Sequence, residues 1–182
     1  MIILRPRDLT WINDQVDDPY DLCAHGKVQF EIDGTNLVRV EDGEWTVSAA
    51  ALFLLRTLKK DHTVEEPLFE NVIPHCGTGF YVEKGGGEVK IIECPIGINF
   101  QVIHTRDTVQ IIMNDMEPFI VASGEWQNAV LTFSQVVREF YAASNPKTPV
   151  DDSDEAGFEK FMTEWKNRHK EALDFWTCNR HR

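Results

Sequence analysis

The chain has 182 residues, and its 30 Asp and Glu side chains outnumber its 18 Lys and Arg side chains, which gives a formal charge of −12. Hydrophobic residues make up 42% of the sequence, enough for a core of its own and too many for a disordered chain. Because phosphate groups and anionic lipids are bound by basic surfaces, this acidity argues against nucleic acid and against a membrane surface as partners.

From the sequence we expect neither a targeting segment nor a membrane-spanning segment. Its longest purely apolar run, Ala49–Leu55, has seven residues, whereas a membrane-spanning helix needs about 20. The first residues, MIILRPRDLTW, lack the long apolar stretch and the cleavage site of a secretory signal. We therefore expect a cytoplasmic protein whose four cysteines, which form no C-x-x-C pair, are reduced thiols.

The first predicted elements form a hairpin followed by a helix. Lys27–Asp33 alternates apolar and polar residues, which is the period of a half-buried strand. Asp33-Gly34 is a strong hairpin-turn signal, and Asn36–Glu41 follows as the return strand. An Ala- and Leu-rich helix is expected over Ala49–Lys60, and its apolar residues on nearly all sides predict burial on more than one face.

Five further strands and two helices are expected after that helix. The strands are Gly79–Glu83, Glu88–Cys94, Ile98–His104, Thr108–Asn114 and Pro118–Ala122. Turn-like segments such as Gly85-Gly86-Gly87 separate them, so they predict an antiparallel meander. Helical spacing of apolar residues predicts a helix over Trp126–Ala143 and an amphipathic helix over Asp154–Trp176. The apolar stripe of the last helix comprises Phe158, Phe161, Trp165 and either Leu173 or Trp176.

Two segments of the chain resemble each other. Val28–Trp45 and Val109–Trp126 align without gaps at an offset of 81 residues, with six of 18 positions identical. Each ends in Gly-Glu-Trp and leads into a predicted helix. The match indicates either an internal duplication or two hairpin-to-helix units that obey the same physics. In both cases Trp45 and Trp126 are expected to be buried anchors.

This order of elements predicts the α+β class. We expect one antiparallel sheet of six or seven strands, with the helices 49–60 and 126–143 on one face. Residues 1–150 are expected to form a single domain of two hairpin-helix units, on which the helix 154–176 packs. The alternative for this helix is that its aromatic stripe contacts a partner or a second copy of the chain.

Histidines and cysteines are the candidates for chemistry. The weak catalytic candidates are His75, Cys76, Cys23 and His25, because a cysteine nucleophile needs a nearby histidine base. The segment HCGTGF, His75–Phe80, offers a thiol, an imidazole and glycine amides together, although an ordinary glycine-rich turn explains it as well.

A zinc site is the other chemistry considered for these residues. Its ligands would come from Cys23, His25, His75, Cys76, Cys94 and His104. The spacings match no standard zinc motif, and the adjacent His75 and Cys76 would point to opposite faces if they lay in a strand. Free cysteines are therefore the default, and no metal or cofactor is expected.

Acidic residues gather in two connecting segments. The candidate partner-binding residues are Asp14, Asp17, Asp18 and Asp21 before the first strand, and Glu65 and Glu66 after the first helix. The leading hypothesis is a non-enzymatic acidic binding protein, for example an inhibitor or immunity-type protein that neutralises a basic bacterial toxin or effector. The alternatives are a small enzyme built on Cys76-His75 or Cys23-His25, and a homo-oligomeric regulatory domain assembled through the C-terminal helix.

Overall fold

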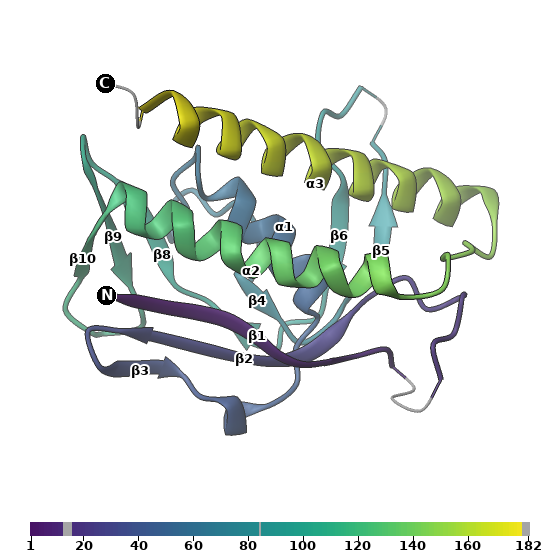
Figure 1. Cartoon of the computed structure of the whole chain (residues 1–182), viewed down its shortest axis with the longest axis horizontal. Helices are drawn as coiled ribbons and strands as arrows, with labels where there is room; N and C mark the ends of the chain where they lie inside the picture. The colour runs from purple at the N-terminus through teal and green to yellow at the C-terminus, as the bar shows by residue number, and fades with distance from the viewer. Residues whose placement is uncertain (13–15, 84, 180–182) are drawn as a thin grey trace.

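The structure of the chain, a computed structural model, describes residues 1–12, 16–83 and 85–179 (Figure 1). Within these ranges it belongs to the predicted α+β class. The helices are α1 (Val47–Arg56), α2 (Ser123–Ala143) and α3 (Asp152–Asn179). The strands are β1 (Ile2–Thr10), β2 (His25–Ile32), β3 (Thr35–Val38), β4 (Ile73–Pro74), β5 (Gly77–Tyr81), β6 (Lys90–Glu93), β7 (Gly97–Ile98), β8 (Gln101–His104), β9 (Thr108–Ile112) and β10 (Phe119–Ala122). No helix in the described ranges has both the length and the apolar character needed to cross a bilayer.

The expected single sheet of six or seven strands is wrong. The described strands form four small antiparallel sheets, with the orders β1-β2-β3, β8-β9-β10, β4-β7 and β5-β6. The reason lies in α1, all ten residues of which are buried. A helix that is buried on every side needs protein on every side, so α2, α3, β2 and β4 all pack against it and no single sheet forms beneath it.

The first strand, β1, is not among the elements that the sequence pattern predicts. Ile2–Thr10 pairs antiparallel with β2, with Leu4 opposite Phe30. Leu4 and Pro6 are buried while Arg5 and Arg7 are exposed, so the segment does follow a two-residue period. In contrast, the hairpin turn at Asp33-Gly34 is confirmed: both residues have positive φ, 50° and 84°, and join β2 to β3.

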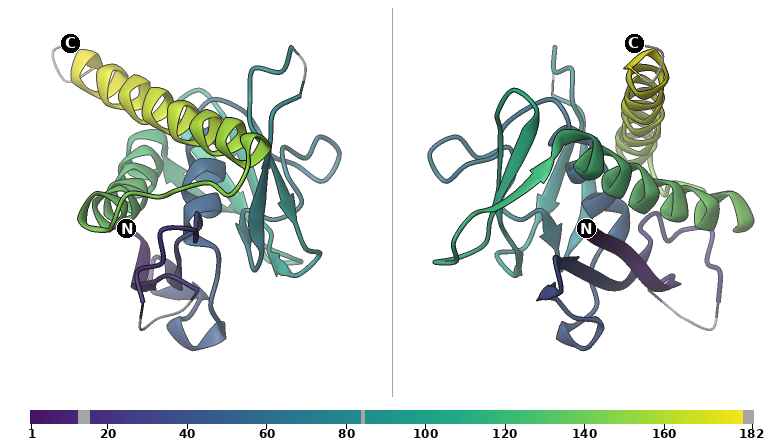
Figure 2. Two further views of the ribbon diagram at one scale, coloured as in Figure 1. Left: turned by 90° about the vertical axis from the view of Figure 1, so that its right-hand side faces the viewer. Right: turned by 60° about the vertical axis from the view of Figure 1, so that its left-hand side comes forward.

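Helices α2 and α3 cover the body formed by α1 and the strands (Figures 1 and 2). The helix α2 packs along β1 and against α1, and α3 contacts β5, α1 and α2. Phe161 and Trp165 of α3 are buried in this body, and the Trp165 indole N–H donates to Ser134 Oγ. Leu173 is exposed, and the Trp176 side chain lies outside the described part. The two central aromatic residues of α3 are therefore used within the chain itself.

An ionic node lies under α3, formed by Arg56, Glu88, Val89, Glu164 and Arg168. Arg56 and Glu164 are only 5% and 7% exposed. Glu164 accepts hydrogen bonds from Arg56 Nε at 3.0 Å, from Arg168 Nε at 2.7 Å and from the Val89 N–H at 2.7 Å. Arg56 also donates to the Val89 carbonyl, and Arg168 to Glu88. The node thus ties α1, α3 and the segment before β6 together.

Candidate functional site

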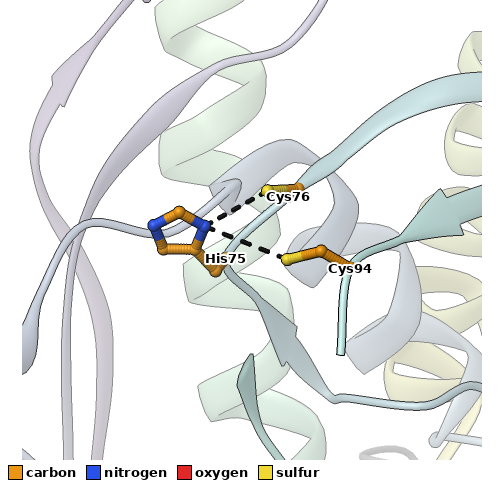
Figure 3. Close-up of side chains that lie close together, drawn as sticks. All are labelled: His75, Cys76 and Cys94. Carbon is orange, nitrogen blue, oxygen red and sulfur yellow. Dashed lines mark hydrogen bonds between the residues drawn. The ribbon is translucent and has the colours of Figure 1, made fainter. Parts of the chain in front are cut away.

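A cluster of His75, Cys76 and Cys94 lies where two strand pairs meet (Figure 3). His75 and Cys76 form the link between β4 and β5, and Cys94 directly follows β6. Because β5 and β6 are antiparallel and Gly77 is opposite Glu93, Cys76 and Cys94 are the next pair along the same hairpin. Residues 18 positions apart in the sequence are thereby brought together.

The three side chains direct their ligand atoms toward one another. His75 Nδ1 lies 3.2 Å from Cys76 Sγ and 4.0 Å from Cys94 Sγ. All three atoms lie within 4.8 Å of one another, the one such group of three among the described residues. The objection that adjacent side chains of a strand point to opposite faces does not apply to His75 and Cys76, because they lie in the link between β4 and β5.

Hydrogen bonds hold the backbone around His75. The Thr46 N–H donates to the Pro74 carbonyl and the Thr46 hydroxyl to the His75 carbonyl, each at 2.9 Å. The His75 N–H donates to the Ile96 carbonyl at 3.0 Å. The edge of the Trp45 ring also meets the His75 ring, with centroids 6.4 Å apart. The backbone that carries the imidazole is thus held by Thr46 before α1 on one side and by Ile96 after Cys94 on the other.

Gly77 lets the cluster sit close to the buried helix. A Cβ at this position would lie 2.8 Å from the Cβ of Ala49 in α1, so a larger residue would push the strand away. The carbonyl of Gly77 accepts a hydrogen bond from the Cys23 thiol at 3.4 Å. Gly77, the first glycine of the HCGTGF segment, therefore allows the strand to pack closely on α1.

The two thiols of the cluster differ in acidity. A hydrogen bond with Cys76 lowers the pKa of Cys94, and the same bond raises the pKa of Cys76. The two thiols therefore do not titrate independently of each other. Both side chains are partly exposed and His75 is exposed, so reagents and ions reach the cluster from solvent.

The second candidate pair, Cys23 and His25, has a different environment. Cys23 is 1% exposed, and burial raises the pKa of its thiol far above the ordinary value. His25 is partly buried, and burial lowers its pKa. A buried, protonated thiol is a poor nucleophile, so this environment favours a packing role for Cys23. His104 lies elsewhere, at the end of β8, with its Nδ1 2.8 Å from Asp61 Oδ1.

The first acidic group is engaged within the chain. Asp17 accepts hydrogen bonds from the Asn145 N–H and from Lys147 Nζ, and the Lys147 bond lowers the pKa of Asp17. Asp21 accepts from the Ile12 and Cys23 N–H groups. These carboxylates hold the segment between β1 and β2 in place, and Asp18 does so as well, by accepting from the Tyr20 N–H.

The remaining acidic candidates have no such role in the described structure. Asp14 lies outside the described residues. Glu65 and Glu66 are exposed, and their carboxylates make no hydrogen bond or ion pair with another described residue. Of the six candidates, these two therefore remain available to a partner.

Sequence reasoning placed Cys94 in a set of metal ligands but did not pair it with His75 and Cys76. The hairpin predicted around Gly85-Gly86-Gly87 brings the two strands together, but regular pairing outward from Tyr81 and Lys90 would place Cys94 opposite Gly77. A register shift between Gly77 and Gly79 moves Cys94 opposite Cys76, and the sequence pattern does not predict that shift.

Comparison with known protein families, curated proteins and solved structures finds no match to this chain. The chemistry of the cluster must therefore be interpreted from its own residues and geometry.

Proposed function

We propose that the protein binds a thiophilic divalent metal ion, Zn²⁺ in first place, through His75 Nδ1, Cys76 Sγ and Cys94 Sγ. The observation that carries this proposal is the mutual distance of the three ligand atoms, all within 4.8 Å. In a tetrahedral zinc site with ordinary Zn–S and Zn–N bonds, neighbouring ligand atoms lie about 3.5–3.8 Å apart. The two distances to His75 Nδ1, 3.2 and 4.0 Å, bracket that range, so small side-chain rotations suffice to close the site.

The donor set indicates both the kind of ion and the kind of site. Thiolate and imidazole ligands favour Zn²⁺ over Mg²⁺ or Ca²⁺, which take oxygen ligands. Three protein ligands leave the fourth position of a tetrahedron to water or to an external ligand, as in catalytic zinc sites. A Zn²⁺ ion there would lower the pKa of a bound water, which gives the small-enzyme alternative a chemical basis.

Cobalt and zinc titrations test the proposal. The reduced protein, kept in a phosphine reductant that does not supply thiols, is titrated with Co²⁺ while the thiolate-to-cobalt absorption band is recorded. We expect one ion per chain and displacement of the cobalt by one equivalent of Zn²⁺. The variants Cys94→Ser and His75→Ala are expected to weaken Zn²⁺ binding by about tenfold or more, because each loses one of three ligands.

The variant Cys23→Ser is the matched control. It also removes one thiol, but from a buried position outside the cluster, and a hydroxyl preserves the hydrogen bond to Gly77. Equal Zn²⁺ affinity in Cys23→Ser and the wild type, with loss in Cys94→Ser, supports the proposal. Equal affinity in Cys94→Ser and the wild type would overturn it.

The binding of a basic protein partner is a second proposal, supported by the exposed segment around Glu65 and Glu66. These carboxylates directly follow Val64, which is 74% exposed, so the segment offers an apolar contact next to two negative charges. If the protein inhibits a basic effector, the double variant Glu65→Lys with Glu66→Lys should abolish chemical cross-linking to that effector at low salt. The control Asp115→Lys with Glu117→Lys, which reverses two exposed charges elsewhere, should leave it intact.

A further inference from the structure

A pocket of about 270 Å³ opens between the three helices and the β8–β9 turn, and none of its lining residues belongs to the cysteine cluster. We call it the α2 pocket because the first turn of α2 forms one wall. Its lining comprises Leu55, Leu58, Lys59, His104, Thr105, Arg106, Val109, Ser123, Trp126, Gln127, Arg168, Glu171 and Ala172. In Figure 1 this region lies at the end of the molecule where β8 and β9 approach the start of α2.

The lining of the α2 pocket contains more cations than carboxylates, unlike the chain as a whole. The lining contains the cations Lys59, Arg106 and Arg168 and one carboxylate, Glu171, whereas the whole chain carries −12. Positive groups grouped on an acidic protein attract an anion locally while the rest of the surface repels it. A lining cation without a counter-charge in the protein therefore favours a small anion over the basic partner considered above.

Arg106 is the cation best placed to bind a ligand. Arg168 is engaged by Glu164 and Glu88, and Lys59 by Glu171. Arg106 lies in the exposed turn between β8 and β9, and its side chain makes no hydrogen bond or ion pair with another described residue. Its guanidinium can thus take a carboxylate with two parallel hydrogen bonds.

The other walls supply a hydroxyl and an apolar surface. Ser123, the first residue of α2, is partly buried, and its hydroxyl has no partner among the described residues. Leu55, Val109 and Trp126 are buried and line the pocket. The Trp126 indole N–H also finds no acceptor among the described residues, which leaves one donor of the lining unsatisfied.

We propose that the α2 pocket binds a small amphipathic carboxylic acid. The carboxylate lies at Arg106 and the Ser123 hydroxyl, beside the first turn of α2. The aliphatic part lies against Leu55, Val109 and Trp126 and is removed from water there. A bare phosphate would leave this apolar wall uncovered, and an uncharged lipid would leave Arg106 without a partner.

Calorimetry with octanoate tests this proposal, with octylamine as the ligand of equal chain length and opposite charge. We expect octanoate to bind with one site per chain and octylamine to bind at least about tenfold more weakly, because only octanoate can form a charge-assisted hydrogen bond with Arg106. The variant Arg106→Glu is expected to weaken octanoate binding by about tenfold or more, and Ser123→Ala by a smaller factor.

Arg5→Glu is the matched control, since Arg5 is an exposed arginine of β1 whose side chain also has no described partner. It should leave the octanoate affinity within about twofold of the wild type. Arg106→Gln serves where charge reversal disturbs folding, which circular dichroism reports. Absence of octanoate binding, octylamine binding as tight as octanoate, or equal octanoate affinities for the Arg106 variants and the wild type would each overturn the proposal.

Discussion

The ionic node under α3 and the His75–Cys76–Cys94 cluster both join segments that are distant in the sequence, but their polar atoms are satisfied to different degrees. In the node, both carboxylate oxygens of Glu164 accept hydrogen bonds, and its charge is paired in a site from which water is excluded. In the cluster, the described contacts of the three side chains are mainly with one another, at the surface. A polar group whose hydrogen bonds are all made within the protein holds the fold together. A polar group at the surface with unused donor or acceptor positions is free to bind an ion or a ligand.

The largest expected effect comes from breaking the node. Burial raises the pKa of Glu164, but the hydrogen bonds and charge of Arg56 outweigh burial, so the pKa lies below its ordinary value and the group is ionised. Glu164→Leu would leave Arg56 buried without its counter-charge. We expect a loss of about 3–5 kcal/mol in the free energy of unfolding, measured by urea denaturation.

The exposed ion pair of Glu171, about two turns after Glu164 along α3, provides the control for that loss. Glu171 pairs with Lys59, and both side chains are more than half exposed. Glu171→Leu should change stability by about 1 kcal/mol or less, because water screens the pair. A loss of stability as large as that of Glu164→Leu would contradict the distinction between a buried, fully hydrogen-bonded carboxylate and an exposed one.

The second effect concerns the cluster with its metal. At a free Zn²⁺ concentration of about 100 times Kd, the free energy of unfolding should rise by about 2.7 kcal/mol, because the ion binds the folded chain. The double variant Cys76→Ser with Cys94→Ser should show no such rise. Without metal, its stability should lie within about 0.5 kcal/mol of the wild type, as expected for partly exposed side chains. A large loss without metal would assign the cluster a structural role like that of the node.

The smallest effect is a pH dependence from His62, a buried histidine with both ring nitrogens occupied. The Leu68 N–H donates to Nδ1, so Nε2 carries the proton and donates to Asn99 Oδ1. Burial lowers the pKa of His62 below its ordinary value. As pH falls through about 6.5, the unfolded chain binds a proton that the folded chain does not, and stability falls by at most about 1.4 kcal/mol per pH unit for this group.

Urea denaturation between pH 7.5 and 5.5 measures this slope. His25 and His169 are also buried enough to have lowered pKa values, so they contribute in the same direction. The variant His62→Gln should therefore flatten the dependence without removing it. A slope as steep as that of the wild type would show that His62 is protonated equally in both states.

Local signals in the sequence predicted most elements but not their assembly. The Asp33-Gly34 turn and the three helices follow from turn chemistry and apolar spacing, which act within a few residues. The division into four sheets depends on α1 being enclosed, which is a property of the whole chain. The meeting of His75 with Cys94 depends likewise on strand register, so neither spacing alone nor motif comparison could establish it.

The two similar segments illustrate the same division between local and global order. Each segment contains two strands of a three-stranded sheet and leads to a helix. Strands β2 and β3 precede α1, and strands β9 and β10 precede α2. Both tryptophans are buried, as expected. However, Trp45 precedes α1 by two residues whereas Trp126 lies within the first turn of α2, so the helices begin at different points of the pattern. An internal duplication stays a hypothesis.

The complete enclosure of α1 also has a consequence for the order of folding. With ten residues, this helix is shorter than the roughly 12–15 residues below which isolated helices are marginal in water. It persists only once the strands and helices that surround it have assembled. The backbone amides of α1 should therefore be among the slowest of the chain to exchange with deuterium, and their exchange should report the opening of the entire domain.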